Sequence, residues 1–98
     1  MNQYYKDLWA KIHKDAIAAD SDQKKADYCA WIHTLPTSIK CPRCRTHLMQ
    51  YLQTNPPDPK GDLFLWSWTL HNSVSRRIGK VEFRYETAAN IWGAPQLK

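Results

Sequence analysis

Glycine, cysteine and long apolar runs are all scarce in this 98-residue sequence. Its three glycines cannot supply a phosphate loop of the GxGxxG or GxxxxGK(S/T) type, so any dinucleotide must be held by side chains. Its three cysteines are too few for the disulfide framework of a small secreted domain. No stretch approaches the roughly 20 apolar residues of a membrane helix, and the polar start does not resemble a signal peptide. We therefore expect a soluble cytosolic protein that does not associate with membranes.

The net charge of +5 is scattered, with 14 lysines and arginines against 9 aspartates and glutamates. A basic balance raises the chance of an anionic partner, such as nucleic acid or a cofactor that carries phosphate. Because the chain contains no basic run and no recognised nucleic-acid module, we expect no nucleic-acid partner. Five tryptophans and five tyrosines can bury a large area in so short a chain, or form the walls around a planar cofactor.

The spacing of the apolar residues predicts five helices and no strand. The expected helices cover residues 3–19, 23–35, 41–54, 62–78 and 81–92. Three prolines within residues 55–61 exclude regular structure between the third and fourth helices. Short connections then predict one all-α domain over residues 1–98, an antiparallel four-helix bundle with a short fifth helix.

Residues 41–47, Cys-Pro-Arg-Cys-Arg-Thr-His, contain two of the three cysteines at the expected start of the third helix. Pro42 suits the first helical position, where its missing N–H is not needed. The helix N-terminus and the neighbouring arginines are expected to lower the pKa of both thiols and so to favour the reactive thiolates. The pair is therefore expected to serve redox chemistry or metal binding.

Zinc is the main alternative to redox chemistry for this pair. A zinc site would use Cys41, Cys44, His47 and a fourth ligand. A structural zinc site normally recruits a second ligand pair, and the remaining candidates are isolated along the chain. They are Cys29, His13, His33 and His71. The spacing therefore favours redox chemistry, although the strand that precedes a thioredoxin-like CxxC is missing.

Polar residues also lie on helix faces that are expected to be buried. Trp9 and His13 are four residues apart, and core packing is enough to explain them. His71 and Asn72 lie in a strongly apolar helix, where polar groups need partners. They give that helix a polar side, which favours a bound polar ligand or a buried network. The helix dipole explains the basic residues 76, 77 and 80 at its end, and a phosphate clamp is the alternative.

Three motifs, in order and at similar spacing, resemble the Erv/ALR family of FAD-linked sulfhydryl oxidases. WAKIH at residues 9–13 is similar to the family's WxxLH, and CPRCRTH at residues 41–47 is similar to its CxxCxx(H/D). HNSVSRRIGK at residues 71–80 is similar to its HNxVNxxLGK. The resemblance spans roughly residues 6–92 and is nearest to the minimal members of large DNA viruses.

This resemblance implies an FAD-dependent thiol oxidase that makes disulfides in protein substrates. Electrons would pass from Cys41 and Cys44 to the flavin and then to O2, which gives H2O2. Cys44 would face the flavin, and Cys41 would exchange with the substrate. The residues expected to bind FAD are Lys6, Trp9, His13, His47, His71, Asn72, Val74, Ser75, Arg77, Lys80 and Trp92. No metal site is expected.

The resemblance also implies partners and a location. The substrate would be a thiol-containing protein, such as a small thioredoxin-like redox protein, and O2 would be the electron acceptor. A homodimer is expected, with surface aromatics such as Tyr4, Tyr28 and Trp31 at its interface. The expected location is the host cytoplasm, at a viral assembly site or in the virion. A small CxxC zinc-binding interaction module is the alternative function, and a basic helical nucleic-acid binder is a third.

The chain departs from the family pattern at several positions. Ser75 stands where the family usually has Asn, so one hydrogen bond to the cofactor is expected to be lost or mediated by water. Trp68 and Tyr85 stand where cellular members often have a second, structural cysteine pair. We expect an aromatic contact between them in place of that disulfide. Cys29 is expected to be a buried structural thiol and not part of a shuttle disulfide.

Overall fold

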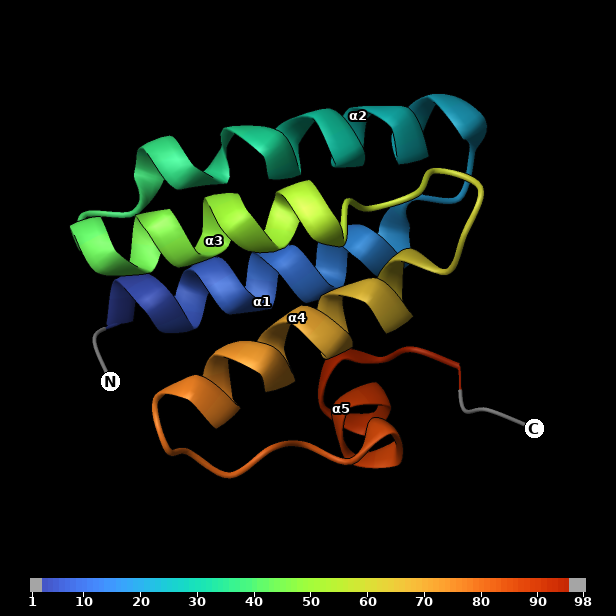
Figure 1. The fold of residues 1–98 in the computed structure, drawn as a ribbon. Coiled ribbons are helices and arrows are strands. Elements are labelled where there is room, and N and C mark those ends of the chain that lie inside the picture. The colour runs from blue at the N-terminus through green and yellow to red at the C-terminus, as the bar shows by residue number, and fades with distance from the viewer. Residues whose placement is uncertain (1–2, 96–98) are drawn as a thin grey trace.

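The computed structural model describes residues 3–95. It contains four helices, each running roughly opposite to the one before it in the sequence, and a short fifth helix (Figure 1). The helices are α1 (Gln3–Ala18), α2 (Asp22–Thr34), α3 (Pro42–Thr54), α4 (Leu63–Arg77) and α5 (Tyr85–Trp92), with a 3₁₀ turn η1 (Leu35–Ser38) after α2. Within residues 3–95 there is no strand, so the expected all-α bundle is confirmed. No helix in this part of the chain has the length and apolar character needed to cross a membrane.

Side chains that accept hydrogen bonds fix where three helices begin. The Ser21 hydroxyl accepts from the Lys24 N–H ahead of α2, and the Asp62 carboxylate accepts from the Leu65 N–H ahead of α4. These bonds satisfy N–H groups that have no partner inside a helix. At the start of α3 the sulfur of Cys41 takes this place. The cysteine pair is therefore anchored by the helix start itself.

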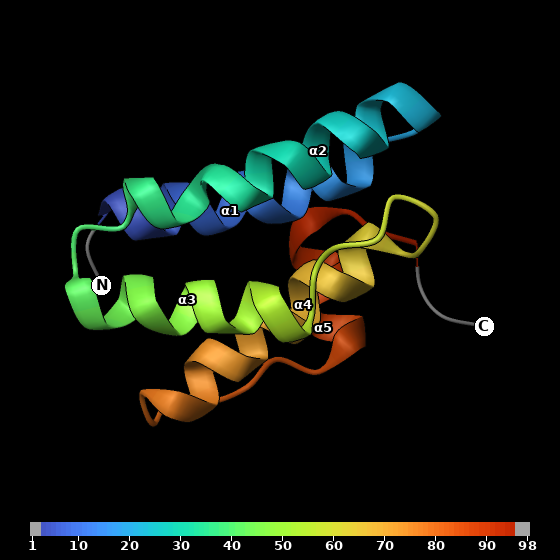
Figure 2. The ribbon, with the colours of Figure 1, turned by 45° about the horizontal axis from the view of Figure 1, so that its top comes forward.

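Helix α1 contacts α2, α4 and α5. Figure 2 shows it running alongside α2. The core contains its Ile12, together with Ile32 of α2 and Phe64 of α4. Cys29 is buried in this core, as expected, and its burial raises the pKa of its thiol. Tyr28 lies on the buried face of α2, as its helical spacing predicts, so only its expected place among the surface aromatics of a dimer interface is wrong. Its ring is buried because its hydroxyl finds a partner there, the Ile12 carbonyl at 2.8 Å.

The segment between α4 and α5 differs from the expectation. Residues 81–84 were expected to begin the fifth helix, but α5 begins at Tyr85. The Asn72 side chain explains this, because its amide donates to the Phe83 carbonyl and accepts from the Phe83 N–H, both at 2.8 Å. Phe83 thereby makes with a side chain the bonds that a helix would make internally. Gly79, with a φ of 77°, ends the α4 region in the left-handed conformation that glycine adopts readily.

The expected aromatic contact between α4 and α5 is present. The rings of Trp68 and Tyr85 meet edge to face, with centroids 5.6 Å apart at an interplanar angle of 78°. The indole N–H of Trp68 also donates to the Phe83 carbonyl at 2.8 Å. This contact and the bonds of Asn72 together hold the 80–84 segment and α5 against α4.

Candidate active site

The two cysteines of the CxxC pair lie at the first turn of α3 and differ in their electrostatics. The backbone N–H of Cys44 donates to the Cys41 sulfur at 3.3 Å. The pKa of the Cys41 thiol is lowered because two groups of Cys44, its S–H and its backbone N–H, donate hydrogen bonds to the Cys41 sulfur. The pKa of the Cys44 thiol is raised because its proton is held by that bond and because it is partly desolvated. The expected lowering is therefore confirmed for Cys41 and wrong for Cys44. Of the two thiols, that of Cys41 therefore loses its proton more readily.

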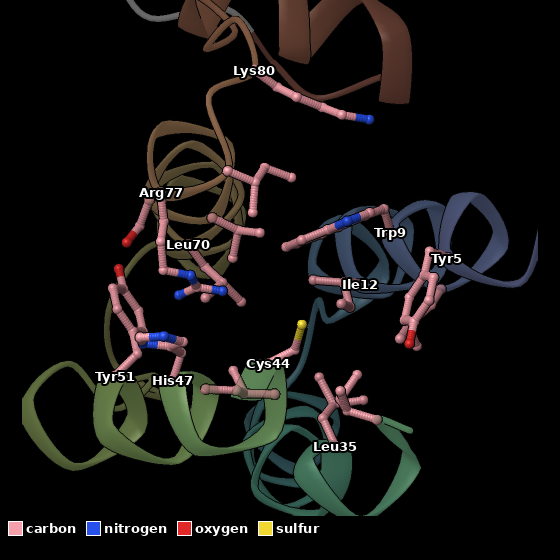
Figure 3. Close-up of a pocket in the computed structure, with 16 residues that line it drawn as sticks. Tyr5, Trp9, Ile12, Leu35, Cys44, His47, Tyr51, Leu70, Arg77 and Lys80 are labelled. Atoms are coloured by element: carbon pink, nitrogen blue, oxygen red, sulfur yellow. The ribbon is translucent and has the colours of Figure 1, made fainter. Parts of the chain in front are cut away.

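A cavity of about 350 Å³, here called the cysteine cavity, lies between α1, α3 and α4. The sulfur of Cys44 points into it, and Trp9 and Arg77 reach in from the other two helices (Figure 3). The positive charge of Arg77 favours the Cys44 thiolate and opposes the effects that raise its pKa. Cys41 does not line this cavity. The pair therefore has one sulfur in the cavity and one outside it.

A second cavity, of about 620 Å³, here called the aromatic cavity, adjoins the first. Trp9 and Lys80 line both cavities, so they form the boundary between the two. The rings of Trp9 and His71 are stacked, with centroids 3.9 Å apart at an interplanar angle of 4°. Trp92 of α5 lines the far wall. The two cavities make one elongated site with aromatic walls and basic side chains along its length.

The structure brings eleven of the thirteen expected site residues together in or beside this site. The cysteine cavity is lined by Trp9, Cys44, His47, Val74, Arg77 and Lys80. The aromatic cavity is lined by Lys6, Trp9, His71, Ser75, Lys80 and Trp92. Cys41 lies next to Cys44 at the start of α3. His13 and Asn72 line neither cavity, because their polar atoms are engaged with Ser67 and His71 and with Phe83.

Several lining residues were missed by the sequence analysis. Tyr5 and Tyr51 line the cysteine cavity, and Phe83 lines the aromatic cavity. Helical spacing could have found the two tyrosines, since Tyr5 is four residues before Trp9 and Tyr51 is four residues after His47. No local signal points to Phe83, whose place depends on the distant side chain of Asn72.

The described part of the chain does not contain the set of ligands that the zinc alternative requires. Among residues 3–95 no group of three or more histidine, cysteine, aspartate or glutamate side chains is arranged to hold a metal ion. His47 was the expected third ligand, and its side chain lines the cysteine cavity near Tyr51 and Arg77 (Figure 3).

Two buried histidines lie behind the Trp9 ring. Burial, and less strongly the charge of His71, lowers the pKa of His13 from 6.5 to about 3. Burial lowers the pKa of His71 to about 4. Both imidazoles are therefore neutral at pH 7 in the folded protein, and protonation of either one opposes folding.

The stability of the fold is expected to fall as the pH drops below 6.5. Above that pH the two histidines are neutral in the folded and unfolded chains, so they do not affect the balance. Below it both histidines become protonated in the unfolded chain. In the folded chain they stay neutral until the pH reaches about 4 for His71 and about 3 for His13, so the unfolded state binds more protons. Each histidine contributes about 1.4 kcal/mol per pH unit, so the free energy of unfolding should drop by about 4 kcal/mol between pH 7 and pH 5. Denaturant titration at pH 7, 6 and 5 measures this drop, and a value that stays constant would contradict it.

Comparisons with known proteins agree with the motifs. Residues 6–93 match the Erv1 / Alr family. A protein of African swine fever virus (isolate Pig/Kenya/KEN-50/1950) named FAD-linked sulfhydryl oxidase is 32% identical over 96 residues, which cover 93% of this chain and 81% of that protein. A protein of the same name from isolate Warthog/Namibia/Wart80/1980 is 30% identical over 95 residues, which cover 92% of this chain and 80% of that protein. Sulfhydryl oxidase 1 of Arabidopsis thaliana is 27% identical over 92% of this chain and 18% of its own length. The resemblance seen in the sequence is thus confirmed: this chain belongs to the Erv1 / Alr family.

Proposed function

We propose that this chain is an FAD-dependent thiol oxidase that makes disulfides in protein substrates and delivers the electrons to O2, giving H2O2. One observation carries the proposal: the sulfur of Cys44 points into a cavity while its partner Cys41 stays outside it. A dithiol pair at the wall of a cavity can take electrons from a partner on the surface and deliver them to a bound molecule within. The family match and the printed names of the viral relatives support the same activity.

The residues of the site fit FAD as the bound molecule. Planar rings of a dinucleotide need aromatic walls, and Trp9, His71 and Trp92 offer such walls in the aromatic cavity. Its diphosphate needs cations, and Lys80 lies at the boundary of the two cavities. We further propose that Lys6 in the aromatic cavity and Arg77 in the cysteine cavity contribute positive charge to the binding of these phosphates. When bound, FAD supplies an acceptor for two electrons beside Cys44 and a route from there to O2.

The cysteines perform the exchange with the substrate. A substrate thiolate attacks the sulfur of Cys41 in the oxidised pair, so the bond between Cys41 and Cys44 breaks and Cys44 leaves as a thiolate. The charge of Arg77 favours this thiolate. A second substrate thiolate then attacks the substrate sulfur of the mixed disulfide and releases Cys41 as a thiolate. The lowered pKa of Cys41 makes it a good leaving group. The substrate leaves as a disulfide, and its two electrons remain in the cysteine pair.

The test of the proposed function is the stoichiometry of thiol oxidation. Protein loaded with FAD and given a reduced dithiol protein is expected to form one H2O2 for each disulfide. Oxygen consumption, peroxide formation and loss of free thiols are measured together. A protein that binds zinc and takes up no FAD would instead support the interaction module.

The surroundings of Cys41 point to the charge of the protein substrate. Every charged residue from position 28 to position 57 is basic, namely Lys40, Arg43 and Arg45. Lys40 and Arg43 are exposed beside Cys41, whereas Arg45 donates to the Ile39 carbonyl at 2.7 and 3.1 Å. We propose a thiol protein with acidic residues near its cysteines, such as a small redox protein of the thioredoxin type.

High salt is therefore expected to slow the oxidation of an acidic protein dithiol. Salt screens exposed charges, so kcat/KM should fall about tenfold between low and high ionic strength. Oxidation of the small neutral dithiol dithiothreitol serves as the control and should change little. A Lys40→Gln, Arg43→Gln variant, which neutralises both charges, should remove most of the salt dependence, and equal salt effects on both substrates would count against an acidic partner.

We further propose that residues 1–98 act as one domain, that the chain forms a homodimer and that it works in the host cytoplasm. The viral relatives support the location. Tyr4 is 42% exposed, and Trp31 is partly exposed beneath the ammonium of Lys11, 4.9 Å from its ring centroid. Both side chains reach the surface, where we place the dimer interface, and sedimentation of the pure protein decides the oligomeric state.

A further inference from the structure

A chain of buried hydrogen bonds runs from the backbone of α4 to the aromatic cavity. The Ser67 hydroxyl oxygen lies 2.7 Å from the Phe64 carbonyl oxygen and 2.9 Å from Nδ1 of His13. Nε2 of His13 lies 2.8 Å from Nδ1 of His71. Ser67 and His13 are fully buried, and His71 is 8% exposed.

The direction of this chain follows from the number of hydrogens that its atoms carry. The Phe64 carbonyl oxygen can accept only, so the contact at 2.7 Å requires the single hydrogen of the Ser67 hydroxyl. If that hydrogen pointed to His13 instead, two oxygen atoms would face each other at 2.7 Å with no hydrogen between them. The hydroxyl oxygen must therefore accept a hydrogen from Nδ1 of His13.

The tautomers of both histidines follow from this first bond. A neutral imidazole carries one N–H, so Nε2 of His13 is bare and accepts a hydrogen from Nδ1 of His71. His71 is then bare at its own Nε2. The lowered pKa of both histidines agrees with neutral rings throughout the chain.

Nε2 of His71 is the atom at the end of this series of hydrogen bonds that can still accept a hydrogen bond from a ligand. His71 lines the aromatic cavity, and in the described part of the chain no hydrogen bond to this nitrogen is found. Among residues 3–95 no fully buried side-chain nitrogen or oxygen lacks a partner, so this nitrogen reaches the open space of the cavity. The stacked ring of Trp9 holds the imidazole plane in place.

We propose that Ser67 is a positioning residue that sets the tautomers of His13 and His71, so that Nε2 of His71 presents a lone pair and no hydrogen to the aromatic cavity. The site then favours a ligand that donates a hydrogen bond at this point, through a hydroxyl or an amino group, and disfavours one that accepts. The ligand part of this inference rests on the proposed function, because FAD carries both hydroxyl and amino groups. Ser67 lies outside the three motifs that indicated the family.

Nitrogen NMR of the histidine rings tests the proposal directly. Protein labelled with ¹⁵N-histidine is examined at pH 7.5, as purified and again with added FAD. His13 and His71 should both show a protonated Nδ1 and an unprotonated Nε2 before FAD is added. A protonated Nε2 on either ring would overturn the proposal. Because these tautomers can be read without a cofactor, a protein that binds no FAD would contradict the proposed function and leave the tautomers measurable.

Variants separate the role of Ser67 from a merely structural one. Ser67→Ala should reverse the direction of the hydrogen bond between His13 and His71, so that both rings carry the hydrogen on Nε2. The Kd for FAD should then rise about tenfold. Ser67→Thr keeps the hydroxyl and should restore the tautomers and the affinity. Thr69→Ala is the matched control, since its hydroxyl also donates to a carbonyl of α4 but lies exposed. Unchanged tautomers in Ser67→Ala would overturn the role of Ser67. If that variant does not fold, the tautomers of the unaltered protein still decide the direction of the chain.

Discussion

Replacing Cys44 by serine is expected to reduce thiol oxidation at least about a thousandfold while FAD stays bound. The sulfur of Cys44 is the one that points into the cysteine cavity, so its loss interrupts the only route that we propose from the surface pair to the bound molecule. A hydroxyl in its place can neither form the disulfide with Cys41 nor leave as a thiolate. Rates are measured by oxygen consumption with a dithiol protein, and bound FAD by its visible absorption.

Cys29→Ala is the matched control for this experiment. It also removes one thiol, but that thiol is buried in the core and lines neither cavity of the site. We expect the control to oxidise dithiols at the rate of the unaltered protein. Full activity in Cys44→Ser would contradict the assignment of this sulfur, whereas a lost activity in Cys29→Ala would assign a role to the third cysteine.

Replacing Trp68 by alanine is expected to destabilise the fold by about 3–5 kcal/mol. The substitution removes the edge-to-face contact with Tyr85 and the hydrogen bond to the Phe83 carbonyl, which together hold α5 to α4. For a domain of this size the melting temperature should fall by at least about 12 °C. Thermal unfolding followed by circular dichroism measures the change.

Trp68→Phe divides this effect into its two parts. Phenylalanine keeps a ring for Tyr85 but has no N–H for the Phe83 carbonyl, so it should lose about 1 kcal/mol. If Trp68→Ala has the melting temperature of the unaltered protein, the contact between Trp68 and Tyr85 does not stabilise the fold in place of the structural disulfide that cellular family members often have.

The helices and the cysteine pair could be predicted because their signals are local. Apolar residues at helical spacing, the proline-rich segment 55–61 and the cap residues all lie within a few positions of the element that they define. Pro42 and the cysteine pair likewise mark the start of α3 within four residues. The family motifs then added which side chains would meet in the site.

The remaining features depend on partners far away in the chain. Residues 81–84 have no periodicity that forbids a helix, and it is the distant side chain of Asn72 that holds them extended. The burial of Tyr28 depends on a carbonyl of α1, 16 residues away. Ser67 meets His13 across 54 residues, so no spacing rule could reveal that the serine orients a histidine. The raised pKa of the Cys44 thiol is an exception, because its first cause is the hydrogen bond with Cys41 only three residues away.

The most direct test of the central claim is the visible absorption spectrum of the purified protein, recorded before and after dithiothreitol is added in air-free buffer. We expect the absorption band of a bound flavin, its bleaching by the reductant and its return when air is admitted. A colourless protein that takes up no added FAD would contradict the assignment of an FAD-dependent thiol oxidase.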